Sequence, residues 1–93
     1  EQEQQVAHLL YSNGVTISGS ADDARRSCEQ NRTSFGTQPA AIARFETSDL
    51  SRLPNDLARM IAGGRFRHAV VGACEVPTVT PFARFRLTVL LYP

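Results

Sequence analysis

The last 28 residues of the chain, 66–93, constrain its fold more than any other stretch. Two apolar runs of strand length, RFRHAVVGACEV (65–76) and FARFRLTVLLY (82–92), are separated by the short connection PTVTP. An arrangement of two such runs around a short connection is typical of antiparallel neighbours. The sequence therefore predicts a β-hairpin that closes the domain.

Alternation along the second run predicts which of its faces is buried. Its odd-numbered side chains are apolar, namely Ala83, Phe85, Leu87, Val89 and Leu91. Its even-numbered positions include Arg84, Arg86 and Thr88. Because successive side chains of a strand point to opposite faces, we expect the odd face to be the core and the even face to be rich in arginine.

The first run predicts a register for the hairpin. Arg67 and Glu75 lie on its odd face, so the even residues should be buried; they are Phe66, Val70, Cys74 and Val76. Matching one buried face to the other places Cys74 opposite Phe85 and Glu75 opposite Arg84.

The rest of the chain predicts three helices and two strands. Apolar spacing, capping residues and glycine or proline breaks place helices at 2–12, from about 20 to 30 and at 48–62, the last with a break before Pro54 and a stop at Gly63-Gly64. The stretches 15–18 and 41–47 are strand-like, and 31–39 is a loop. We expect an α+β fold in which two to three helices pack on one face of a small, mostly antiparallel sheet.

Length and composition bound the function. At 93 residues the chain is one domain, 1–93, because a second hydrophobic core would lack apolar area. With 42% hydrophobic residues, 20% charged residues and a net charge of +1, it resembles neither a disordered chain nor a general polyanion binder. No apolar run has the length of a membrane span, so we expect no membrane span, and nucleic acid is not the expected partner.

Cys28 and Cys74 bear on the cellular compartment. They lie too far apart for a local redox or zinc motif, and neither has a histidine at metal-ligand spacing, so we expect no metal site and no cofactor. In an exported domain they would form one disulfide; in a cytosolic domain they would be two buried thiols. The chain starts without methionine, which favours the disulfide and a secreted or periplasmic location. All ten basic residues are arginine, which suggests a bacterial source.

Few residues could carry chemistry. His68 cannot reach Cys74 along a strand, because six residues of strand span about 20 Å. Cys28 with His8 or His68 remains as a thiol-dependent alternative, although structural cysteines are far commoner. Asp22-Asp23 is better interpreted as a helix cap than as a catalytic pair. Nothing in the sequence therefore identifies an enzyme.

Four arginines cluster in the sequence around the hairpin: Arg65, Arg67, Arg84 and Arg86. Arginine forms bidentate contacts with carboxylate or phosphate, so this set could bind an anionic partner. The alternative is a solvated sheet face on which Glu75 is the partner.

The segment 61–72, IAGGRFRHAVVG, together with the final run 82–92, resembles the end of bacterial members of the CAP superfamily of secreted proteins. In those proteins a helix closes with an HRxNIL stretch and is followed by an RFRxVGVGV strand and a last strand that ends in an aromatic residue. Where the family carries a metal-binding histidine, this chain has Leu57. The resemblance implies a minimal CAP-like domain without the metal site, and no family site residue is carried over.

Three functions follow as hypotheses. The first is a non-catalytic, extracytoplasmic α+β binding module whose partner is another protein or a small ligand held between helices and sheet. The second is a structural domain that self-associates through the edge of the hairpin, as a homo-oligomer. The third is an enzyme that uses a free Cys28 thiol.

Overall fold

The computed structural model describes residues 2–18, 21–30, 38–76 and 84–93. In chain order these residues form α1 (Gln2–Ser12), β1 (Thr16–Ile17), α2 (Asp22–Gln30), β2 (Ala41–Thr47), α3 (Asn55–Ala62), β3 (His68–Cys74) and β4 (Phe85–Tyr92). The strands make one sheet in the order β1-β3-β4-β2, in which β1 runs parallel to β3 and the other neighbours are antiparallel. The predicted α+β class is confirmed, and the helix 2–12 and the strand 41–47 have their predicted bounds.

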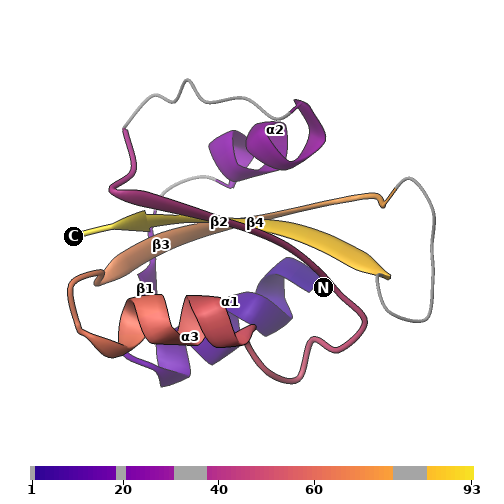
Figure 1. Ribbon diagram of the computed structural model, residues 1–93. Helices are drawn as coiled ribbons and strands as arrows, with labels where there is room; N and C mark the ends of the chain where they lie inside the picture. Colours follow the sequence, from indigo (N-terminus) through magenta and orange to yellow (C-terminus); the bar gives the residue numbers. More distant parts are fainter. Residues whose placement is uncertain (1, 19–20, 31–37, 77–83) are drawn as a thin grey trace.

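The sheet separates two layers of helix (Figure 1). Helices α1 and α3 cover one face, and the larger hydrophobic core lies beneath them; its buried members are Val6, Leu10, Val15, Leu57, Ile61, Ala69, Val71, Leu87, Val89 and Leu91. Helix α2 lies on the opposite face, where Ala24 packs with Val70 and Leu90 in a smaller cluster. Two helices therefore pack on one face of the sheet, as predicted, and the third covers the opposite face.

The hairpin is present, but its register differs from the prediction by one residue. Cys74 lies opposite Arg86, not opposite Phe85. The prediction assigned the faces of β3 from the charges of Arg67 and Glu75, and both residues lie just outside the strand. Inside the strand all residues after His68 are small or apolar, so no charged side chain marks a solvent face. The connection 77–81 and the loop 31–37 are outside the described residues.

Correcting the register exchanges the two faces of β3. Ala69 and Val71 join the larger core with the odd residues of β4, as the pairing of Val71 with Val89 requires. Val70 instead faces α2, and so does Cys74. Both faces of β3 are thus covered, which explains why its sequence does not alternate between polar and apolar residues.

Gly72 lets α2 approach β3 closely. A Cβ atom at this position would lie 2.3 Å from the backbone nitrogen of Arg25 and 2.4 Å from the carbonyl carbon of Ala24. No side chain can occupy that space without a shift of the helix or the strand. The glycine therefore sets the distance between these two elements.

Helix α3 begins later than predicted, at Asn55 and not at Ser48. Pro54 precedes it with an extended backbone (φ −57°, ψ 148°), and proline disfavours helical conformation in the residue before it. The skipped segment forms a turn in which the Asp49 carboxylate accepts the backbone N–H of Ser51 at 2.9 Å and the Ser51 hydroxyl. Hydrogen bonds from Ser51 hold the pKa of Asp49 below its ordinary value.

The two strands of the hairpin both lie inside the sheet. β3 has β1 and β4 as neighbours, and β4 has β3 and β2. The predicted self-association through the hairpin edge stays a prediction: β1 covers the outer edge of β3 only at His68 and Ala69, and the other terminal strand of the sheet is β2.

Candidate binding groove beside the disulfide

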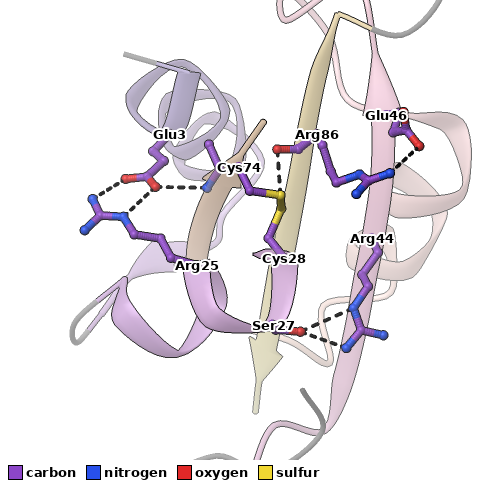
Figure 2. Close-up of a disulfide and its surroundings, with 9 residues drawn as sticks. Glu3, Arg25, Ser27, Cys28, Arg44, Glu46, Cys74 and Arg86 are labelled. Atoms are coloured by element: carbon purple, nitrogen blue, oxygen red, sulfur yellow. Dashed lines mark hydrogen bonds and ion pairs between the residues drawn. A yellow bond between two sulfur atoms is a disulfide. The ribbon is translucent and has the colours of Figure 1, made fainter. Parts of the chain in front are cut away.

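Cys28 and Cys74 join helix α2 to strand β3 (Figure 2). Their sulfur atoms are 1.97 Å apart and their Cα atoms 5.8 Å apart, so the structure brings the predicted pair together as a disulfide. The Sγ atom of Cys28 also lies 3.6 Å from the carbonyl oxygen of Arg86 on β4. In this form neither cysteine is a free thiol, and the thiol-dependent hypothesis has no nucleophile.

An ion pair between Glu3 of α1 and Arg25 of α2 reinforces the junction of α2 with β3. The Arg25 guanidinium donates two hydrogen bonds to the Glu3 carboxylate, at 2.7 and 2.6 Å, and the backbone N–H of Ala73 donates a third at 2.9 Å (Figure 2). The bond to Arg25 is the main reason that the pKa of Glu3 lies below its ordinary value. Glu3 thus links α1, α2 and β3 at one point.

An open groove runs past the disulfide. A cavity of about 820 Å³ on the β3 side and one of about 530 Å³ on the β2 side share Cys28, Glu29 and Arg86 as lining residues. Because they share these residues, we treat them as two arms of one groove, the disulfide groove. Its lining comes from α2, from β2, β3, β4 and the residues beside them, and, in the β3 arm, also from Gln2 of α1.

Polar side chains organise the β2 arm of the groove. Arg86 on β4 donates to the Glu46 carboxylate on β2 at 3.2 Å, and Arg44 on β2 donates to the Ser27 hydroxyl on α2 at 2.7 and 3.3 Å (Figure 2). Thr88 lies opposite Arg44 on the same face of the sheet. These contacts fix both guanidinium groups at the edges of the arm.

The Thr88 hydroxyl is the one side-chain oxygen or nitrogen that is fully buried without a hydrogen-bond partner among the described residues. Its side chain is 0% exposed and lines the β2 arm of the groove. An unsatisfied buried hydroxyl costs about 1–3 kcal/mol.

The structure divides the four arginines predicted to bind an anion. Arg84 and Arg86 line the groove at the start of β4. Arg65 and Arg67 precede β3, and the Arg67 N–H donates to the carbonyl of Tyr92 at the other end of β4. The two pairs are separated by the length of the strands, about 20 Å. They do not form one site. Arg86 pairs with Glu46, whereas the predicted pair on this face was Glu75 with Arg84.

The two histidines are exposed and belong to different places. His8 is on the outer side of α1, beside a separate cavity, and His68 begins β3 at the end remote from Cys74. Within the described ranges, no three His, Cys, Asp or Glu side chains gather as metal ligands do.

Sequence reasoning missed the residues that organise the groove. Arg44 and Glu46 alternate with apolar neighbours in β2, and this pattern could have shown a polar face on that strand. Ser27 and Thr88 gave no such signal, since each is a small polar residue within a regular element. Their burial follows from where α2 lies on the sheet.

Comparisons with protein-family models, curated proteins and solved structures found no match to this chain. Among the described helices, the longest apolar stretch falls short of what crossing a bilayer requires.

Proposed function

We propose that this chain is a non-catalytic, extracytoplasmic binding module that holds a small ligand with a single anionic group in the disulfide groove. The disulfide supports the location, because such bonds persist in oxidising compartments. The resemblance to secreted CAP proteins agrees with that location and stays a proposal. The Thr88 hydroxyl carries the binding hypothesis: it lines the β2 arm without a hydrogen-bond partner among the described residues, and a ligand oxygen would reach it once the side chains that cover it move aside.

Arg86 is the residue that would meet the anionic group. Its Nη2 donates to Glu46, and among the described residues its Nε and Nη1 donate to nothing. A guanidinium has five N–H donors in a plane, which suits a carboxylate or a phosphate. The β2 arm is lined by two arginines and two glutamates, so its field is too weak to collect polyanions.

Anion titration of ¹⁵N-labelled protein tests this proposal. We expect saturable shifts at the Thr88 amide and the Arg86 side chain on addition of sodium acetate or sodium phosphate, at ionic strength matched with chloride. Comparing the two probes separates carboxylate from phosphate recognition. Arg86→Gln should reduce the affinity at least tenfold, the equivalent of about 1.4 kcal/mol.

Arg59→Gln is the matched control. Arg59 is exposed on α3, on the opposite face of the sheet, and its loss should leave the titration unchanged. Shifts that do not saturate, or that persist in Arg86→Gln, would contradict the proposal.

A further inference from the structure

The sheet has one long edge that the described residues leave open. β2 is its terminal strand, spans seven residues and contains no proline. Alternate residues of such a strand direct backbone N–H and C=O groups away from the sheet, where they can pair with another strand. The same strand contributes Arg44, Phe45 and Glu46 to the lining of the β2 arm of the groove.

The other edge is protected in two ways. β1 is only two residues long, and it pairs with β3 at His68 and Ala69. Further along β3, the N–H of Ala73 donates to the Glu3 carboxylate, which Arg25 holds in place. Short strands and charged side chains are common devices against unwanted pairing. The contrast singles out β2 as the edge available for pairing.

We propose that β2 pairs antiparallel with β2 of a second copy of this chain, about a twofold axis at Phe45. In that register Arg44 lies opposite Glu46 of the partner subunit, and Glu46 lies opposite Arg44 of the partner subunit. Both pairs fall on the face that carries α2, and opposite charges at directly facing positions stabilise a sheet. A homodimer with one continuous sheet results.

The charges of Arg44 and Glu46 disfavour the neighbouring registers of the β2–β2 pair. Moving the axis to Arg44 would set this arginine against its own copy, and moving it to Glu46 would set two glutamates together. A one-residue slip would place the polar face of one β2 opposite the apolar face of the other. Only the axis at Phe45 pairs every charge of the strand with its opposite.

The contacts of Glu46 and Phe45 are compatible with this pairing. Glu46 accepts from Arg86 through Oε1, and within the described part of the chain its Oε2 accepts nothing, so a second guanidinium can bind there. On the other face Phe45, which is half-buried against the larger core, would meet Phe45 of the partner subunit. Aromatic cross-strand pairs add to sheet stability, and this one would extend the core across the axis.

A charge exchange tests the proposal. In sedimentation equilibrium we expect the native chain to be a dimer with twice the mass of the chain. Glu46→Arg alone sets arginine opposite arginine at both positions beside the axis. Arg44→Glu alone sets glutamate opposite glutamate at the same two positions. Each single change should raise the dimer dissociation constant at least tenfold.

The triple variant R44E/E46R/R86E should return the dissociation constant to near its native value, because opposite charges then face each other again both across the axis and between β2 and β4. Circular dichroism of every variant establishes that the monomer is folded, so that loss of the dimer is not loss of the fold. A monomeric native chain at high concentration would overturn the inference. So would a dimer that both single changes leave intact, or a triple variant that stays as weak as the singles.

Discussion

Glu3 serves three elements with one carboxylate. It is the acceptor for Arg25 and for the Ala73 N–H, and it is the side chain that closes the β3 edge. Its pKa is held below the ordinary value of 4.5, chiefly by the Arg25 hydrogen bond. The unfolded chain therefore takes up this proton at a higher pH than the folded chain does. The stabilisation is complete above about pH 4.5 and is lost as the pH falls through the lower, folded-state pKa.

Glu3→Gln should consequently lower the melting temperature by a few degrees at pH 7 and by progressively less below pH 4.5. Thermal unfolding across this pH range measures the difference between the two proteins. Glu75→Gln is the control, because Glu75 is exposed and outside the ion pairs of the described residues. If the melting temperature of Glu3→Gln lies below that of the native protein by the same amount at every pH, the carboxylate charge is not what stabilises the junction.

Single residues also show the limits of sequence reasoning. Nothing near Glu3 in the sequence indicates Arg25 or Ala73 as a partner, because these contacts exist only after α1, α2 and β3 have packed. Cys28 and Cys74 were recognisable as a candidate pair, since a small domain with two cysteines has one connectivity to consider. Contacts can be predicted from the sequence for residues, such as cysteine, whose chemistry allows few partners.

At the scale of elements, the close packing of α2 on β3 depends on Gly72. An alanine there would require backbone movement, because the nearest atoms to its Cβ are backbone atoms of α2. We expect Gly72→Ala to lower the free energy of unfolding by about 2 kcal/mol or more, as other overpacked cores do. Denaturant unfolding gives the measurement.

Gly63→Ala provides the comparison. Gly63 has φ −76°, and nothing lies within 4 Å of an added Cβ, so this change should be neutral or slightly stabilising. If both variants unfold alike, α2 tolerates displacement and Gly72 does not set its position.

The elements themselves were largely predictable, and their faces were not. The helix 2–12 ends before Asn13-Gly14 and the strand 41–47 follows a loop that ends in Pro39, so their bounds were found from clear breaks. The predicted register of the hairpin is wrong because β3 is covered on both faces. The charges that indicated a solvent face, on Arg67 and Glu75, lie outside the strand. The groove was missed for the same reason: it exists only once α2 is placed on the second face.

The molecule as a whole depends on its disulfide. A covalent link across a sequence separation of 46 residues removes enough unfolded-state entropy to stabilise the fold by about 4 kcal/mol. Small domains have total stabilities of roughly 5–15 kcal/mol, so this is a large fraction. We expect the double variant C28S/C74S to melt roughly 20 °C below the native protein.

Calorimetry of the native protein with and without reductant measures the same effect, and the serine variant serves as the control that reductant should not change. An unaltered melting temperature after verified reduction would contradict a stabilising role for the bond.

The position of the disulfide in the chain has one more consequence. Cys28 and Cys74 enclose the end of α2 and all of β2, α3 and β3 in a covalent ring. A protease that cuts the backbone once anywhere inside this ring leaves both fragments bound to each other. The nicked protein keeps its full mass until a reductant is present, so an electrophoretic assay without reductant would miss the damage.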